Sequence, residues 1–223
     1  MRRRTMLLLV AMAAMVVLVS GVALAQVIVG TAHSDLIVGT NNPDLIKGLG
    51  GNDDLNGQRA ADVLRGGSGN DGLFGQKGND TSYGGPGKDR FRELGGQFGP
   101  GSNDTGQDVM HGGGGTDLLE GGSEGDNLHG GPNSSLTTQE KLYGDRGGDK
   151  LYGEDGTDYL EGEKGSDLMR GGDGDDEINA ANHETVGTPD TVRCGSGLDV
   201  VTANNNDRVA EDCEDVTRVA NPQ

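Results

Sequence analysis

Residues 66–74 read GGSGNDGLF, and the pattern of this stretch decides the fold of the chain. Six small, polar or acidic residues are followed by three residues with one apolar side chain, Leu73, in the middle. Written G-G-x-G-x-D-x-U-x, with U apolar, this nine-residue unit recurs from Gly30 almost to the end of the chain. A repeat of fixed period predicts a solenoid in which each unit stacks on its neighbours.

The aspartate of the unit keeps its register along the chain. It recurs at every ninth residue early on, breaks at residues 93–102, and slips by five residues around 130–140 and again before Asp190. Each stands two places before an apolar residue, with Ser82 as the exception, and Glu140 replaces one aspartate. The aspartates in register are Asp35, Asp44, Asp53, Asp62, Asp71, Asp80, Asp89, Asp108, Asp117, Asp126, Asp149, Asp158, Asp167, Asp176, Asp190, Asp199 and Asp207.

The residue types at these spacings suit a cation-binding turn followed by a short strand. Glycine at the first, second and fourth positions allows crowded or left-handed backbone and leaves carbonyl oxygens uncovered. Carbonyl and carboxylate oxygens are the ligands that calcium prefers, and a single turn supplies too few of them. The triplet x-U-x suits a brief strand with U pointing inward. One inward residue in each nine-residue unit is a thin core, so a unit needs neighbours on both sides.

The unit resembles the calcium-binding nonapeptide of the RTX (repeats-in-toxin) family of secreted, haemolysin-type bacterial proteins. Four units match at every defined position: 66–74, 84–92, 112–120 and 171–179. The resemblance implies an all-β fold, a parallel β-roll or β-solenoid of about seventeen units with two units per turn. Turns starting at Gly48, Gly66 and Gly84 would then line one edge and those at Gly57 and Gly75 the other.

The resemblance also implies several Ca²⁺ ions held between stacked turns. Aspartate carboxylates and glycine carbonyls of the same turns would supply the ligands. The aspartates are Asp53, Asp62, Asp71, Asp80, Asp89, Asp117, Asp126, Asp149, Asp158, Asp167 and Asp176. The glycines are Gly66, Gly84, Gly112, Gly144, Gly153, Gly162 and Gly171. Gly144 would stack with Gly162 and Gly153 with Gly171, whereas the slip at 130–143 would disturb the partners of Asp117 and Asp126.

Some turns depart from the pattern. A side chain at the fourth position, as at His33, Asn42, Ala60 and Glu124, should hinder the tight turn. We therefore expect the first two turns to stack without full calcium occupancy. In the well-formed turns the alternative is that the aspartates only cap the turn.

Residues 1–25 do not follow the nine-residue repeat. Arg2 to Arg4 precede an apolar run, and Ala23-Leu24-Ala25 has the small-x-small pattern of a signal peptidase site. This predicts a secretory signal peptide cleaved after Ala25, the alternative being a retained membrane anchor. The expected organisation is signal peptide 1–25, first roll block 26–92, irregular insertion 93–102, second block 103–179 with a slip at 130–143, and C-terminal capping repeats and tail 180–223.

Charge restricts the partners. The full chain carries −18, and removal of residues 1–25, which hold three arginines and no acid, leaves −21. Nucleic acid and anionic lipid are therefore not expected as partners, and cations are. With 43 glycines, no tryptophan and 3% aromatic residues, only the repeat argues against disorder.

Cys194 and Cys213 are the only cysteines. An even count in a chain with an expected secretory signal predicts a disulfide, placed where the last turns lack a stacked neighbour.

Catalysis is not indicated. Residues 121–125 satisfy G-x-S-x-G but fall inside a repeat turn, and the four histidines form no H-E-x-x-H pair. We expect no enzyme activity and no small-molecule substrate. The predicted function is a secreted calcium-binding protein that couples calcium binding to folding. The alternative is a structural or adhesive module of the cell surface, associated with the envelope.

Overall fold

The computed structural model describes residues 25–91, 106–132, 139–181 and 188–220. These residues form strands joined by bends, with no helix among them, which confirms the all-β prediction. The expected signal peptide, apart from Ala25, and the insertion 93–102 lie outside the described residues. Within the four described ranges, no helix long and apolar enough to span a membrane is found.

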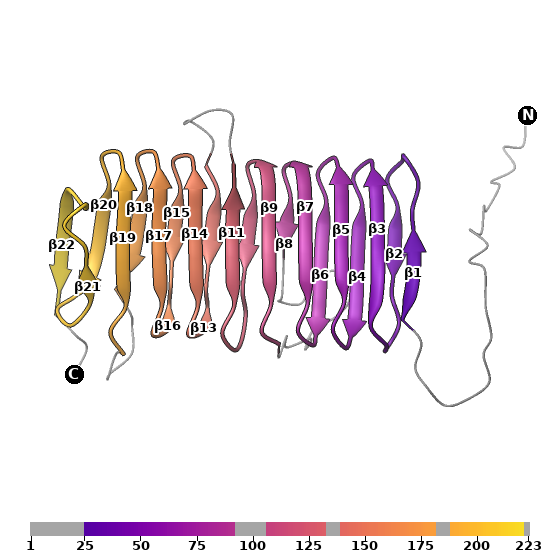
Figure 1. Ribbon diagram of the computed structural model, residues 1–223, viewed down its shortest axis with the longest axis horizontal. Coiled ribbons are helices and arrows are strands. Elements are labelled where there is room, and N and C mark those ends of the chain that lie inside the picture. Colours follow the sequence, from indigo (N-terminus) through magenta and orange to yellow (C-terminus); the bar gives the residue numbers. More distant parts are fainter. Residues whose placement is uncertain (1–24, 92–105, 133–138, 182–187, 221–223) are drawn as a thin grey trace, which may run out of the picture.

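The strands form two long sheets of ten strands each, one behind the other in Figure 1. Sheet A contains β1 (Gln26–Val29), β3 (Asp44–Gly50), β5 (Val63–Ser68), β7 (Thr81–Gly87), β9 (Val109–Gly115), β11 (Asn127–Gly131), β14 (Lys150–Asp155), β17 (Leu168–Asp173), β19 (Thr191–Ser196) and β21 (Arg208–Val209). Sheet B contains β2 (Leu36–Val38), β4 (Asp54–Arg59), β6 (Gly72–Lys77), β8 (Arg90–Phe91), β10 (Leu118–Glu120), β12 (Lys141–Tyr143), β15 (Tyr159–Glu161), β18 (Glu177–Ala180), β20 (Val200–Asn204) and β22 (Asp215–Val219). β13 (Arg146–Gly147) and β16 (Lys164–Gly165) form a small third sheet.

Successive units alternate between the two sheets, so the chain coils with two units per turn. Every strand pairs in parallel with the strand one coil further on, as Ile46 does with Leu64 in sheet A and Leu55 with Leu73 in sheet B. The pairing step is 18 residues in the regular part of the chain. The β-roll prediction is therefore confirmed.

The breaks in the sequence period do not interrupt either sheet. Ser82 of β7 pairs with Met110 of β9 across a step of 28 residues. The expectation that the slip at 130–143 disturbs the partners of Asp126 is wrong, because the Asp126 amide donates to Oδ1 of Asp149 at 2.8 Å across a step of 23 residues. The strands on either side of each break still pair, because connections between strands accept added length at low cost.

The core consists of the single apolar residue of each unit, which points between the two sheets. These side chains are almost completely buried, and Ser82 occupies one of the places. Burial of each Leu or Ile contributes about 1.5–3 kcal/mol, but only through stacking, since an isolated unit has nothing to bury it against. The column contains Ile37, Ile46, Leu55, Leu64, Leu73, Phe91, Met110, Leu119, Leu128, Leu142, Leu151, Leu160, Met169, Ile178, Val192 and Val201.

The C-terminal end of the roll is closed covalently. Cys194 of β19 is fully buried and forms a disulfide with Cys213, with an S–S distance of 2.00 Å. The predicted pairing is confirmed. It ties the connection before β22 to the last full coil, where no further coil stacks.

Candidate metal centre

Bends of glycine-rich sequence join the two sheets along both long edges of the roll (Figure 1). The upper bends follow the strands of sheet A, as residues 66–71 do, and the lower bends follow sheet B, as residues 57–62 do. Bends starting at Gly48, Gly66 and Gly84 share the upper row, and those at Gly57 and Gly75 share the lower row, as the sequence predicts. The pairs Gly144 with Gly162 and Gly153 with Gly171 also stack as predicted.

All four units that match the repeat at every position lie in the upper row. They begin at Gly66, Gly84, Gly112 and Gly171. In the lower row the second position is filled by Gln58, Gln76, Asp145 and Glu163, all with positive φ between 62° and 81°. The second position is thus left-handed in both rows, and the upper row meets this demand more often with glycine.

The aspartates at the sixth position form two ladders, one behind each row of bends. In the upper ladder, Oδ1 of Asp71 accepts a hydrogen bond from the Asp53 amide at 2.8 Å, and Oδ1 of Asp89 accepts one from the Asp71 amide at 2.9 Å. In the lower ladder, Oδ1 of Asp62 accepts a hydrogen bond from the Asp44 amide at 2.7 Å. One carboxylate oxygen per aspartate therefore binds the backbone of the preceding coil.

The second carboxylate oxygen, Oδ2, differs from Oδ1 in its hydrogen bonding. In most of the predicted ligand aspartates Oδ2 is buried and accepts no hydrogen bond. A buried carboxylate oxygen without a partner is costly, so it calls for a cation or a proton. The predicted ligands of this kind are Asp53, Asp62, Asp71, Asp89, Asp117, Asp149, Asp158, Asp167 and Asp176, and Asp199, which is not a predicted ligand, has the same unpartnered Oδ2.

The glycine at the first position of each bend leaves room beside this oxygen. A Cβ on Gly153 would lie 2.6 Å from Oδ2 of Asp158 and 2.6 Å from the carbonyl oxygen of Gly171 in the next coil. A Cβ on Gly112 would lie 2.5 Å from Oδ2 of Asp117. The predicted ligand glycines Gly66, Gly84, Gly144, Gly162 and Gly171 are crowded in the same way by the aspartate of their own bend. Only glycine fits where a carboxylate oxygen and a carbonyl oxygen approach the same point.

The first two bends are built differently. Thr31 occupies the second position of the first bend, and both its amide and its Oγ1 donate to Oδ2 of Asp35, at 2.6 and 2.9 Å. Thr40 does the same for Oδ2 of Asp44, at 2.6 and 3.0 Å. We call these two the threonine-closed bends and the bends from residue 48 onward with an unpartnered Oδ2 the open bends.

Residues with a side chain at the fourth position of a bend differ in their backbone conformation. Ala60 and Glu124 keep the tight turn by adopting positive φ values of 76° and 82°. A side chain therefore does not prevent this turn, although left-handed backbone costs a non-glycine residue about 1–2 kcal/mol. His33 and Asn42 do not adopt positive φ, because they belong to the threonine-closed bends.

Burial and stacking perturb the carboxylates of the open bends. Desolvation by burial raises the pKa of Asp62 to about 7 and that of Asp149 to about 8, and repulsion from stacked aspartates adds to both. The same causes raise the pKa of Asp89 and of Asp176 to about 7. The hydrogen bond from the preceding coil opposes the rise without cancelling it. The ladders thus favour neutralisation of their carboxylates.

The donor set fits calcium in chemical type. The bends offer carboxylate and carbonyl oxygens, the hard ligands of this ion. Among the described residues no three His, Cys, Asp or Glu side chains converge to hold a metal. Carbonyl oxygens of the bends would therefore have to complete any coordination shell, as the nonapeptide pattern requires.

Two features of the site were not predicted from the sequence. One is the ladder role of Asp44, Asp108, Asp190 and Asp207, which lie in register but are not among the predicted ligands. The other is closure of the first two bends by threonine. Thr31 and Thr40 replace the second glycine, and this substitution was the available signal.

The match to known families agrees with this geometry. A family model described as the RTX calcium-binding nonapeptide repeat matches in four copies, at residues 29–64, 57–91, 103–133 and 143–178. These ranges cover more than half of the 223 residues. A search of curated proteins finds no matching relative. The chain is a calcium-binding β-roll protein and belongs to the family of RTX calcium-binding nonapeptide repeats.

Proposed function

We propose that this protein is a secreted, non-catalytic calcium-binding protein whose β-roll forms when calcium occupies its open bends. The observation that carries the proposal is the contrast between the two kinds of bend. Where threonine closes the bend, Oδ2 of the aspartate has two donors from the chain. In the open bends the same atom is buried with none, as in Asp71 and Asp158.

The proposed ligands are the eleven aspartates of the sequence prediction. Nine of them, including Asp53, Asp62 and Asp71, have a buried, unpartnered Oδ2, and these carry the assignment. Asp80 and Asp126 are assigned by their place in the same ladders. Carbonyl oxygens of the first-position glycines, such as Gly66 and Gly171, would complete the shells. Calcium supplies positive charge between stacked carboxylates, which reverses the repulsion along each ladder.

Coupling to folding follows from linkage. The unfolded chain has no stacked bends, so calcium binds the folded roll in preference and stabilises it by mass action. Each independent site contributes about 2.7 kcal/mol when free calcium is at 100 times its dissociation constant. Because every bend needs the coil before and after it, loss of calcium from a few sites should unfold several coils together.

Calcium titration of the chelator-treated protein tests the proposal. Far-ultraviolet circular dichroism should change from a disordered to a strand spectrum as calcium is added, and magnesium at the same concentration should not replace it. Calcium stoichiometry, measured by equilibrium dialysis, should show several ions per chain. A protein that is rich in strand in excess chelator and unchanged by calcium contradicts the proposal.

Secretion is a separate part of the proposal. We propose cleavage after Ala25, roll blocks over residues 26–92 and 103–179 separated by the insertion 93–102, with a slip at 130–143, and C-terminal capping repeats and a tail over 180–223. The support is the three-part N-terminal sequence and the Cys194–Cys213 disulfide, which suits an oxidising compartment. N-terminal sequencing of protein recovered from the culture medium should begin at Gln26. Protein that keeps residues 1–25 and stays with the membrane would indicate an anchor instead.

A further inference from the structure

One row of side chains runs along the outer face of sheet A, with one residue from each of eight successive strands. We call it the cationic row. Backbone pairing places these residues directly beside one another from coil to coil, so that the row is straight. Its members are Lys47, Arg65, Tyr83, His111, His129, Tyr152, Arg170 and Arg193.

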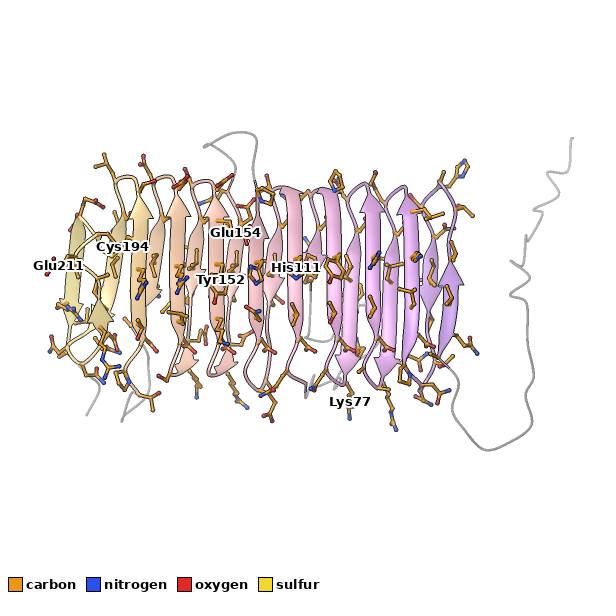
Figure 2. The ribbon with its side chains drawn as sticks, viewed as in Figure 1. Lys77, His111, Tyr152, Glu154, Cys194 and Glu211 are labelled. Carbon is orange, nitrogen blue, oxygen red and sulfur yellow. A yellow bond between two sulfur atoms is a disulfide. The ribbon has the colours of Figure 1, made fainter. Side chains whose placement is uncertain are left out.

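The middle of the row is a continuous stack of four rings. Tyr83 stacks on His111 with ring centroids 4.9 Å apart, and His111 stacks on His129 at 4.8 Å. His129 stacks on Tyr152 at 4.7 Å. Figure 2 shows His111 and Tyr152 on the same face of the roll, at similar heights. The ring faces are occupied by one another, so the row offers its polar ring edges to a ligand.

Arginine side chains extend the stack at both ends. The Arg65 guanidinium lies 5.4 Å from the centroid of the Tyr83 ring, and that of Arg170 lies 5.6 Å from the centroid of the Tyr152 ring. These cation–π contacts hold the two guanidinium groups in line with the rings. Arg65, Arg170 and Arg193 are exposed, so their positive charges face solvent.

The outer faces of the two sheets differ in their carboxylates. Among the described strands of sheet A, the residues that flank the core residue on the outer face include no carboxylate. Lys150 and Arg208 add positive charge there. Glu154 lies at the rim, in the bend beyond the row, with Oε1 2.9 Å from Nδ1 of His129. The corresponding places of sheet B include the carboxylates Asp54, Glu120, Glu161, Glu177 and Asp215 beside the cations Arg90 and Lys141.

From this arrangement we infer that the cationic row is a binding track for a linear acidic polysaccharide. Adjacent strands are about 4.8 Å apart, so eight side chains span about 34 Å in a row that is one residue wide. This spacing is of the same order as one sugar residue in an extended chain. Guanidinium forks suit carboxylate or sulfate groups, and the His and Tyr ring edges suit sugar hydroxyls.

The shape of the row disfavours other polyanions. A duplex nucleic acid or a bilayer would extend beyond one row and approach acidic bend residues such as Asp155 and Asp173, within a screening length of about 8 Å. A single-stranded nucleic acid binds through free aromatic faces, and here the faces are already stacked. The negative net charge of −18 therefore does not exclude this one ligand, because the row presents local charge of the opposite sign.

Binding of dextran sulfate oligomers to the calcium-loaded full chain tests the inference, with neutral dextran as the ligand control. The triple variant Arg65→Gln/Arg170→Gln/Arg193→Gln should weaken binding by about tenfold or more and make it less dependent on salt. The matched control is Arg59→Gln/Lys77→Gln/Arg146→Gln, which removes the same charge from bends of the lower row. Lys77 lies at that lower edge in Figure 2. This control should change affinity by less than about twofold, because those cations lie off the row.

Three results would overturn the inference: equal loss of binding in the two triple variants, equal binding of neutral dextran, or tighter binding of a single-stranded DNA of the same charge through the same arginines. Circular dichroism in calcium checks that each variant is folded. The binding measurement is made on protein that circular dichroism shows to be folded in calcium. A negative result therefore contradicts the polysaccharide inference alone, whereas the calcium proposal is tested by whether calcium drives folding.

Discussion

The threonine-closed bends at residues 30–35 and 39–44 and the open bends from residue 48 onward connect the same two sheets with different backbone conformations and different chemistry. Both place an aspartate behind the bend, and in both Oδ1 of the next aspartate accepts the amide of the one before. They differ at Oδ2, which Thr31 and Thr40 satisfy in the first two bends and which is unpartnered in open bends such as that of Asp71. The comparison teaches that a connection between the two sheets does not itself require a cation. Opening the bend with glycine leaves a buried carboxylate oxygen that needs a cation or a proton.

The largest expected difference between the two kinds of bend is at the fourth position. Gly69, in an open bend, has φ of +134°, and a Cβ there would overlap the carbonyl oxygen of Gly51. Gly69→Ala should lower the free energy of unfolding by about 3 kcal/mol. The matched change Asn42→Ala, in a threonine-closed bend with ordinary φ, should change it by less than about 0.5 kcal/mol. Urea unfolding in calcium measures both, and equal effects would show that the two bends do not differ in backbone demand.

The next difference is in calcium binding. Asp71→Asn keeps an oxygen for the Asp53 amide but removes the charge, so it should reduce the number of bound calcium ions. The accompanying loss of stability is about 2–3 kcal/mol for each ion lost at saturating calcium. Asp44→Asn disturbs the Thr40 hydrogen bonds yet should leave the calcium stoichiometry unchanged. Equilibrium dialysis distinguishes the two, and loss of calcium in Asp44→Asn would show that threonine-closed bends also bind the ion.

A smaller effect, in the absence of calcium, is the pH dependence of the open bends. Burial raises the pKa of Asp62 to about 7 and that of Asp149 to about 8 in the folded roll, from an ordinary value of 3.8. Between these values the folded state binds more protons than the unfolded state, so stability falls as pH rises from about 4 to about 8. In excess chelator the strand signal should thus be stronger near the acid end of this range.

Calcium should remove that dependence, because the ion replaces the proton as the neutralising charge. Calcium affinity should correspondingly weaken on acidification, as protons compete for the same carboxylates. A chelator-treated protein whose stability rises with pH over this range would contradict the assigned sign. Circular dichroism at several pH values, with and without calcium, makes both measurements.

The smallest expected change in the free energy of unfolding is in an open bend that lacks glycine at the fourth position. Ala60 holds a left-handed φ of 76° at the fourth position. Ala60→Gly should stabilise the roll by about 1 kcal/mol, because glycine adopts this conformation without strain. Ala61→Gly, one residue on and without a positive φ, should give no gain. If both changes stabilise the roll, the effect is a general one of glycine and is not relief of backbone strain at Ala60.

The nonapeptide period alone predicted most of the architecture. Short strands and a core of one residue per unit follow from residues such as Leu64, Leu73 and Asp71 in a fixed register, and the resemblance to the RTX repeat implied two units per coil and the rows of stacked bends. The cysteine count and the expected export predicted the terminal disulfide. The period could not predict that both sheets continue across the insertions. An insertion has the same effect on the sequence period whether or not it interrupts the pairing of the strands on either side.

The sequence by itself determined that this chain must stack its units, since no unit holds enough apolar surface to fold alone. Only the tertiary structure decided which carboxylate oxygens are satisfied by the chain, because the sequence shows Thr40 in place of the second glycine but not that its amide and Oγ1 reach Oδ2 of Asp44. It also brought Tyr83, His111 and His129 into one row, although steps of 28 and 18 residues separate them. The physical reason is that coiling makes neighbours of residues one turn apart, whatever the length of the connection between them.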